Sequence, residues 1–229
     1  MSIGFRILRR RRAVPSELVD RFRTLPVANV SDSMWRITAG GPRLRPYYGG
    51  ATMAGPAFTV KTRPGDNLMV HKALDLASPG DIVVVDAGGD LTNAIIGEIM
   101  SAHAEKRGLG GIVINGSIRD STTLAAGTFP VFAAGVTHRG PYKDGPGEIN
   151  VPIAIDGMVI EPGDLIVGDG DGLLCVPFDQ VESVLQATEK KFQAEQVQIA
   201  NVKAGTSDRS WIDATLKRLN VEIEGESSK

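Results

Sequence analysis

The sequence of 229 residues has little of several features that define particular classes of protein. Cys175 is its only cysteine, which excludes an intrachain disulfide. No apolar run approaches the roughly 20 residues of a membrane span, and the basic N-terminus lacks the apolar segment of a secretory signal. With 25 basic and 27 acidic residues the net charge is −2, whereas a general nucleic-acid binder is usually basic. We therefore expect a cytoplasmic protein that binds neither nucleic acid nor membranes.

Two local features stand apart from this ordinary composition. Residues 9–12 are four consecutive arginines, which we interpret as a solvated N-terminal arm, with contact to a polyanion as the alternative. Cys175 lies in an apolar run and is predicted to be a buried structural thiol rather than a reactive one.

The centre of the chain alternates between strand-like and helix-like segments. Strands are expected at 53–62, 82–86, 111–115 and 131–134, and helices at 15–25, 29–34, 67–77, 92–107 and 121–126. The order from 82 to 134 is β-α-β-α-β, which favours a largely parallel sheet with crossover helices. The predicted fold class is therefore α/β.

The remainder of the chain follows a different pattern. Asp156-Gly157 predicts a hairpin turn between strands at 151–155 and 158–160, and further strands are expected at 165–167 and 173–177. A long helix over 178–204, a helix over 211–219 and a polar tail over 222–229 follow. We divide the chain into an N-terminal arm and helix (1–24), an α/β core (25–178) and a helical extension (179–229), forming a single domain overall.

A weak internal echo links two of the expected strands. Pro79-Gly80-Asp81 precedes the strand at 82–86, and Pro162-Gly163-Asp164 precedes the strand at 165–167. One pair of copies is too little for a repeat protein. It indicates the same loop-into-strand geometry used twice.

Gly97 lies inside the helix expected over 92–107, where glycine costs about 1 kcal/mol relative to alanine. One explanation is that the helix begins nearer Glu98 and leaves its first amides free to bind a carboxylate. The other is a packing glycine that lets the helix approach the sheet. The loop over 87–90 and Arg119-Asp120 both follow expected strands, so we expect them at the same edge of the sheet.

Arg119-Asp120 pairs a cation with a hard oxygen ligand, and Glu98 precedes the pair with 20 residues between. The guanidinium suits a bidentate carboxylate contact, and the aspartate suits Mg²⁺ or Mn²⁺. Taken alone, such a dipeptide is more often a surface ion pair or a helix cap. The histidines have no metal-type spacing and are interpreted as packing or surface residues: His71, His103 and His138.

The stretch 97–120 resembles the RraA-like family. The resemblance is carried by Gly97-Glu98-Ile99, Gly111-Ile112-Val113-Ile114, Gly116 and Ile118-Arg119-Asp120, and it continues through 145–152 and 162–164. The resemblance spans roughly residues 25 to 200. Its most specific part is Glu98 followed, after 20 residues, by Arg119-Asp120. It implies a layered sheet of the swivelling β/β/α type with crossover helices and a helical C-terminal extension.

The resemblance also implies a site for pyruvate on a divalent cation. The backbone amides of Gly97, Glu98, Ile99 and Met100 would hold the pyruvate carboxylate. Arg119 would contact the pyruvyl oxygens.

The same resemblance assigns the metal and an assembly. Asp120 would be the direct protein ligand of Mg²⁺ or Mn²⁺, and Glu98 would orient a metal-bound water. The family's assembly implies a homotrimer or a hexamer made of two trimers. In it, Glu195 of the partner subunit, with Glu189 as the alternative, would add an acid to the site.

The activity implied is that of a metal-dependent lyase that cleaves a C–C bond of a 2-oxo acid to release pyruvate. It is the activity of 4-hydroxy-4-methyl-2-oxoglutarate aldolases, which also decarboxylate oxaloacetate. Glu98 and Thr123 favour this branch, because the regulator branch has glycine at the first position and an acid at the second. The alternatives are a noncatalytic regulator that binds a ribonuclease or another protein, and a lyase for a different oxo acid.

Overall fold

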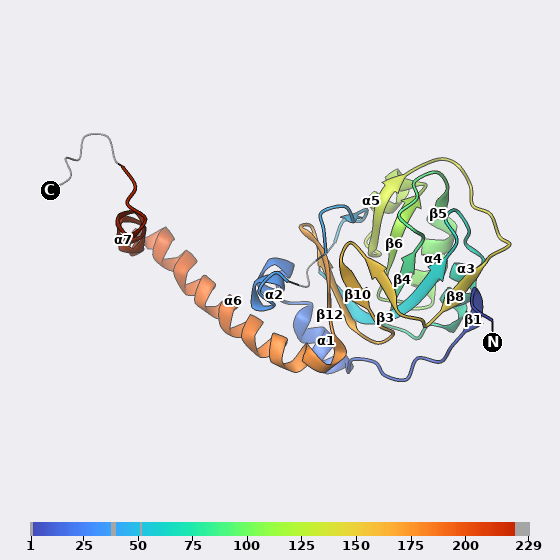
Figure 1. Cartoon of the computed structure of the whole chain (residues 1–229), viewed down its shortest axis with the longest axis horizontal. Helices are drawn as coiled ribbons and strands as arrows, with labels where there is room; N and C mark the ends of the chain where they lie inside the picture. Colours follow the sequence, from blue (N-terminus) through green and yellow to red (C-terminus); the bar gives the residue numbers. More distant parts are fainter. Residues whose placement is uncertain (1, 38–39, 51, 223–229) are drawn as a thin grey trace. The chain divides into compact units, whose positions relative to one another are not determined.

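A computed structural model describes residues 2–37, 40–50 and 52–222 (Figure 1). The strands are β1 (Phe5–Ile7), β2 (Arg45–Pro46), β3 (Met53–Thr62), β4 (Ile82–Asp86), β5 (Ala94–Ile96), β6 (Gly111–Ile118), β7 (Val131–Val136), β8 (Gly147–Ile149), β9 (Ile153–Ile155), β10 (Met158–Ile160), β11 (Leu165–Asp169) and β12 (Gly172–Val176). The helices are α1 (Ser16–Phe22), α2 (Val27–Ser33), α3 (Leu68–Leu76), α4 (Glu98–Lys106), α5 (Ser121–Ala126), α6 (Val181–Ala204) and α7 (Ser210–Arg218), with a 3-10 turn at Phe178–Gln180 before α6. The polar tail expected at the C-terminus lies, from residue 223 onward, outside the described residues.

The sheet confirms the α/β class predicted from the sequence. Strands β3, β4, β6 and β7 are neighbours and run parallel. The long strand β3 belongs to two layers, because its first residues pair with β11 and its last residues pair with β4 and β8. The hairpin around Asp156-Gly157 is present as β9 and β10.

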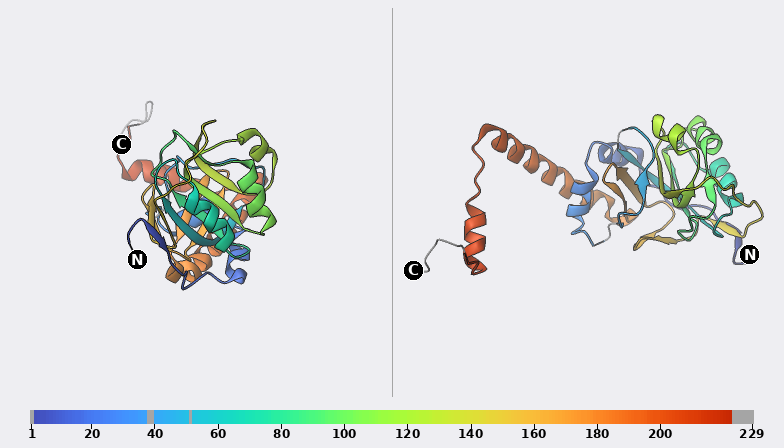
Figure 2. Two further views of the ribbon diagram at one scale, coloured as in Figure 1. Left: turned by 90° about the vertical axis from the view of Figure 1, so that its right-hand side faces the viewer. Right: turned by 90° about the horizontal axis from the view of Figure 1, so that it is seen from above.

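The main core lies between the parallel strands and the crossover helices. Val83, Val85, Ile112 and Ile114 are fully buried together with apolar side chains of α3 and α4. Figure 2 shows these teal and green helices packed against one side of the sheet. Strand β9 contacts β3 and β4. Because the strands are buried on both faces, they read as continuous apolar runs rather than alternating ones.

The expected helix over 92–107 is wrong in its first third. Residues Ala94–Ile96 form strand β5, which pairs parallel with β6, and α4 begins only at Glu98. The two isoleucines of this segment are β-branched and fully buried, so they pack well in a strand. Of the two explanations for Gly97, a helix that starts at Glu98 is therefore confirmed.

The chain divides into two compact units, residues 1–189 and 190–229. The N-terminal arm belongs to the first unit, and the boundary between the units falls inside α6. In the second unit, the described part of the chain continues α6 with exposed Val197, Ile199 and Val202, and Trp211 on α7 is exposed too. Among the helices of the described residues, none is both long enough and apolar enough to cross a bilayer.

The arginine-rich arm is an extended strap, and the interpretation of a solvated arm is wrong for three of its five arginines. Arg6, Arg10 and Arg12 form ion pairs with carboxylates, whereas Arg9 and Arg11 are exposed. The alternation follows from the period of two in an extended chain. Strand β1 at the start of the strap pairs parallel with β8, where Arg6 Nε donates to buried Glu148 at 2.6 Å. This hydrogen bond, with one from Gly4 N–H, lowers the pKa of Glu148.

The turns at Pro79-Gly80-Asp81 and Pro162-Gly163-Asp164 have the same structure. In the first copy, Asp81 accepts the amide of Ser78 on one oxygen, 2.8 Å away, and Arg10 on the other, 2.6 Å away. In the second copy, Asp164 accepts the amide of Glu161 on one oxygen at 2.8 Å, and Arg12 Nη2 lies 3.4 Å from the other. Both aspartates are 2% exposed. The echo in the sequence therefore marks two buried turns, each holding one inward-facing arginine of the strap.

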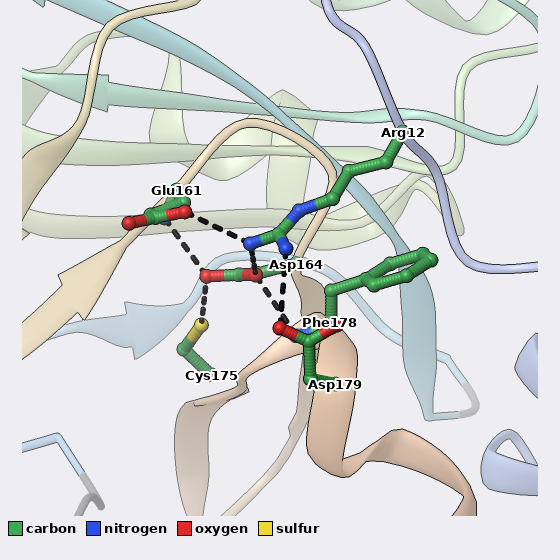
Figure 3. Close-up of polar contacts among 6 residues, drawn as sticks. All are labelled: Arg12, Glu161, Asp164, Cys175, Phe178 and Asp179. Carbon is green, nitrogen blue, oxygen red and sulfur yellow. Dashed lines mark hydrogen bonds and ion pairs between the residues drawn. The ribbon is translucent and has the colours of Figure 1, made fainter.

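Asp164 also joins the strap to the start of the C-terminal helix. Figure 3 shows its carboxylate between Arg12, the thiol of Cys175 and the amide of Phe178, which donates at 2.9 Å. The Arg12 guanidinium lies over the Phe178 ring, 4.9 Å from its centroid. Burial, and then the negative charge of Asp164, raise the pKa of Cys175 well above its usual range. The expectation of a buried structural thiol fits this setting.

The strap generates a prediction about stability. Arg10→Gln should lower the free energy of unfolding by about 1–3 kcal/mol, because it removes a charge-assisted hydrogen bond to a buried carboxylate. Arg9→Gln and Arg11→Gln are matched controls on exposed positions of the same strap and should change it by less than about 0.5 kcal/mol. Urea unfolding followed by circular dichroism measures all three. Equal effects at the three positions would contradict the inward and outward alternation.

Candidate functional site

The site is built where α4 begins. Gly97 is extended (φ −153°, ψ −162°) and follows β5, and the Ser101 amide donates to its carbonyl at 3.1 Å. The amides of Ile99 and Met100 have no acceptor within the described ranges. Free N–H groups and the helix dipole make such an end a favourable place for a carboxylate.

Gly97 is required by close approach rather than by its backbone angles. A Cβ on Gly97 would lie 2.3 Å from Asp120 Oδ2 and 2.8 Å from Arg119 Cγ. No side chain fits against these atoms without displacing them. The contact that excludes a Cβ is therefore with the Arg-Asp pair, and not with the sheet as the packing explanation supposed.

Asp120 reaches from the end of β6 to the start of α4. It has left-handed backbone angles (φ 58°, ψ 31°), which aspartate tolerates better than most residues. Its Oδ2 accepts the Glu98 amide at 3.0 Å, and Arg119 Nε lies 3.6 Å from the same oxygen. Asp120 stands at the N-cap position of α5 but its side chain does not cap that helix. The carboxylate instead accepts the first amide of α4, that of Glu98.

Two cavities share Arg119. The first, of about 340 Å³, is lined by Asn67, His71, Ala94–Gly97, Ile99, Met100, Arg119, Gly140, Pro141 and Lys143. The second, of about 320 Å³, is lined by Arg119, Asp120, Val136, Thr137 and His138. The wall of the first contains two cations and no carboxylate, and the wall of the second contains the carboxylate of Asp120. Arg119 thus borders one cavity whose wall has no acid and another whose wall has the Asp120 carboxylate.

Several residues of these walls were not singled out as site residues from the sequence, among them Asn67, His71 and Lys143. Lys143 lies in a segment without a recognisable motif, Asn67 was expected only as the start of the helix over 67–77, and His71 was interpreted as a packing or surface residue. Burial, and then the charge of Lys143, lower the pKa of His71, which favours the neutral imidazole at pH 7. Asn67 is 2% exposed and donates to the Ile95 carbonyl, while its Oδ1 has no partner. An unpaired acceptor at a cavity wall is a signal that only the structure carries.

Glu98, Glu189 and Glu195, which were also expected at the site, line neither cavity. The side chain of Glu98 is exposed and lines neither cavity, so its contribution in this structure is the backbone amide that Asp120 binds. Glu195 lies on α6 in the second unit, where Lys191 Nζ is 3.0 Å away. Glu189 accepts hydrogen bonds from Arg21.

Asp120 is the group in this site that fits a divalent cation. Within the described residues, no three His, Cys, Asp or Glu side chains converge as a metal cluster. Asp120 Oδ1 has no hydrogen-bond partner there, and its side chain is 37% exposed beside the second cavity. A single hard carboxylate oxygen with open space around it suits Mg²⁺ or Mn²⁺, which take their other ligands from water and substrate.

Comparison with known proteins identifies similar chains. A relative from Halalkalibacterium halodurans, named as a putative 4-hydroxy-4-methyl-2-oxoglutarate aldolase, is 43% identical over 175 residues, covering 76% of this chain and 83% of its own. A crystal structure of an uncharacterized protein from Pseudomonas syringae superposes with a TM-score of 0.77 at 28% identity, covering 85% of this chain and 96% of that one. The RNA-processing inhibitor RraA from Thermus thermophilis superposes with a TM-score of 0.61 at 30% identity, covering 66% and 92%.

The match to the family extends over most of the core. The sequence model of the RraA-like family, described as Aldolase/RraA, matches residues 27–175. These residues include the whole of the Gly97 to Asp120 stretch and both cavity walls described above. The chain belongs to the RraA-like family.

Proposed function

We propose that this protein is a divalent-metal-dependent lyase that releases pyruvate from a 2-oxo acid. The proposed activity is that of a 4-hydroxy-4-methyl-2-oxoglutarate aldolase with oxaloacetate decarboxylase activity. The observation that carries the proposal is the joining of Arg119 and Asp120 to the open N-terminus of α4, beside an acid-free cavity. The name of the Halalkalibacterium halodurans relative supports it.

Each group of the proposed site has a role that follows from its charge. In this proposal, the amides of Ile99 and Met100 bind the C1 carboxylate of the substrate, and the Arg119 guanidinium donates to the C2 oxygen. Asp120 would hold the cation, which when bound supplies Lewis-acid stabilisation of the charge that develops on that oxygen. Arg119 adds positive charge at the same oxygen, and it is already held beside Asp120 before the reaction.

The bond changes follow from this arrangement. In the aldol cleavage, the C4 hydroxyl loses a proton and becomes the carbonyl of the departing fragment, the C3–C4 bond breaks, and the electron pair of that bond passes onto the C2 oxygen. Protonation at C3 then completes pyruvate. Decarboxylation of oxaloacetate releases CO₂ and leaves the same electron pair, but it needs no base for a hydroxyl. Glu98, at the first residue of α4, is the acid that we propose to assist proton transfer in the aldol cleavage.

We also propose a homotrimer or a hexamer in which the partner subunit completes the site. Ile99, Val136 and Tyr142 border or flank the cavities and are 79%, 48% and 59% exposed. Exposed apolar side chains gathered around a site are typical of a surface that another chain covers. Glu195 of the partner subunit is the acid that this assembly would bring to the site.

The first prediction tests the metal ligand. Purified protein should release pyruvate from oxaloacetate faster with Mg²⁺ or Mn²⁺ than the spontaneous rate, measured by coupling to a pyruvate-consuming dehydrogenase. Asp120→Asn should lower this rate at least about a hundredfold and remove the response to metal. Asp213→Asn makes the same charge change on α7 and should leave it unchanged. Absence of metal-dependent release by the unaltered protein would favour the noncatalytic regulator.

A second prediction tests the close approach at Gly97. Gly97→Ala should lower kcat/KM about a hundredfold, because the added Cβ displaces the Asp120 carboxylate and the Arg119 side chain. Gly170→Ala is the matched control, since a Cβ there meets nothing within 4 Å. Steady-state kinetics and thermal unfolding of both variants are compared. Full activity in Gly97→Ala would show that the reaction does not require Arg119 and Asp120 at the positions they have in this structure.

A third prediction tests the shared site. Arg119→Ala and Glu195→Gln should each be weakly active alone. Mixed oligomers, made by co-expression, should regain activity because some sites then combine an intact Arg119 with an intact Glu195 from the other copy. Activity no higher than that of the separate variants would contradict a site built from two subunits.

A further inference from the structure

A third cavity is lined by the end of α2 and the first turns of α6, and it shares no residue with the two cavities of the proposed active site. It lies wholly within the first unit, its volume is about 400 Å³, and its apolar wall consists of Met34, Trp35, Pro177, Val184 and Ala187. No charged side chain is among the described residues that line it. This space, the Trp35 cavity, therefore suits an apolar side chain better than a charged small molecule.

A fixed turn presents Trp35 to solvent at the rim of this cavity. Trp35 is 85% exposed, and Ile37 two residues later is 86% exposed. Trp35 and Arg36 both have left-handed backbone angles (φ 58° and 62°), which are unfavourable for residues with large side chains. The turn is held because the Arg36 amide donates to the Ser31 carbonyl at 3.0 Å and the Arg36 guanidinium lies 2.7 Å from the Asp32 carboxylate. Backbone strain of this kind concentrates at functional positions, so we interpret Trp35 as part of a contact surface.

Helix α7, in the second unit, has an exposed apolar face. Trp211, Thr215 and Leu219 follow one another at intervals of four residues and therefore lie on one side of the helix, with Leu216 beside them. Trp211 and Leu219 are 65% and 58% exposed. A helix of nine residues is marginally stable in water unless such a face packs against another surface. Helix α7 also lies outside residues 27–175, so its partner surface is not explained by the match to the family.

The rim of the Trp35 cavity and the end of α7 have opposite charges. Asp179 and Glu182 flank the cavity residues at the start of α6, where the Asp179 side chain is 78% exposed and Glu182 is exposed too. The last turn of α7 contains Lys217 and Arg218, and Asp213 is the only acid among residues 210–218. A basic amphipathic helix therefore complements an apolar cavity that has an acidic rim.

Chain length excludes docking of α7 in the cavity of its own chain. The last cavity residue on α6 is Ala187, and the helix continues to Ala204, which lies about 26 Å further on at the rise of an α-helix. Residues 205–209 then connect α6 to α7 and span at most about 18 Å when fully extended. This connection is too short to return Trp211 to Ala187, so the helix that fits the cavity must come from another copy.

We propose that the Trp35 cavity binds helix α7 of a second copy of this chain, with Trp211 against Trp35 and the basic last turn of α7 near Glu182. Each copy then donates one helix and receives one, an exchange that closes in a symmetric oligomer. The aromatic contact supplies most of the affinity, and the charges at the rim fix the orientation of the helix. Because the cavity shares no residue with the proposed active site, this contact holds or fails independently of the proposed activity.

The experiment traps the contact as a disulfide between two copies. One copy has Ser183→Cys at the cavity, the other has Thr215→Cys on the apolar face of α7, and the two are co-expressed with different affinity tags. Mild oxidation and non-reducing gel electrophoresis should then give a cross-linked product that carries both tags. Cys175 is 2% exposed and should not compete. Asp213→Cys, on the polar face of α7, is the matched control for Thr215→Cys and should give at least about tenfold less product, because a disulfide forms only between cysteines in close contact.

Substitutions away from the two cysteines test what holds the helix. Trp211→Ser, added to the copy with Thr215→Cys, should lower the yield about tenfold because it removes the largest apolar contact. Glu182→Lys in the cavity copy should also lower the yield. Lys217→Glu with Arg218→Glu in the other copy should then restore it, because the charges of the two surfaces are exchanged. A yield that none of these changes alters would contradict docking.

Two further outcomes would overturn the inference. A chain that carries both Ser183→Cys and Thr215→Cys and cross-links only within itself, as a monomer, would show that α7 binds the cavity of its own chain. Absence of the product from both arrangements would show that α7 does not bind this cavity. Thermal unfolding followed by circular dichroism establishes that each variant is folded before oxidation, so a missing product cannot be attributed to an unfolded chain.

Discussion

The candidate site depends on one hydrogen bond, from the backbone N–H of Glu98 to the carboxylate of Asp120. It joins the first residue of α4 to the turn that follows β6, and it holds the Arg-Asp pair against the open end of the helix. The bond exists because Gly97 has no Cβ, since any larger residue would occupy the position of Asp120 Oδ2. A glycine, a backbone amide and an aspartate therefore define the geometry in which Arg119 acts.

The same pair separates two electrostatic environments. Arg119 borders one cavity whose wall includes Lys143 and no acid, and a second cavity whose wall includes Asp120, one oxygen of which has no hydrogen bond within the described residues. Binding an anion in the first space and a cation in the second brings opposite charges together across the guanidinium. A substrate that spans both spaces gains from each contact, which is the arrangement expected of a site that stabilises charge developing on a 2-oxo group.

The strap and the site are connected through β8. The strap contributes strand β1 to the edge of β8, and its inward-facing arginines neutralise Glu148, Asp81 and Asp164. The loop that carries Lys143 leads directly into β8. Asp66 accepts a hydrogen bond from the Asp144 amide of this loop. The buried acids thus pair with arginines and backbone amides in the turns and strap, whereas the Asp120 side chain is 37% exposed.

Local sequence was enough for the α/β class, for eight of the twelve strands of the described residues and for the helices, because periodicity and short motifs express contacts between near neighbours. The roles proposed for Arg119 and Asp120 came from the resemblance to the RraA-like family. Local sequence was not enough for β5, since an apolar segment of three residues pairs as a strand only when β6 lies beside it. Nor did it reveal that the strap arginines are paired or that Asn67 and Lys143 share a wall with Arg119. These contacts join residues far apart in the chain, and only the packing of loops, strap and helices against one sheet brings them together.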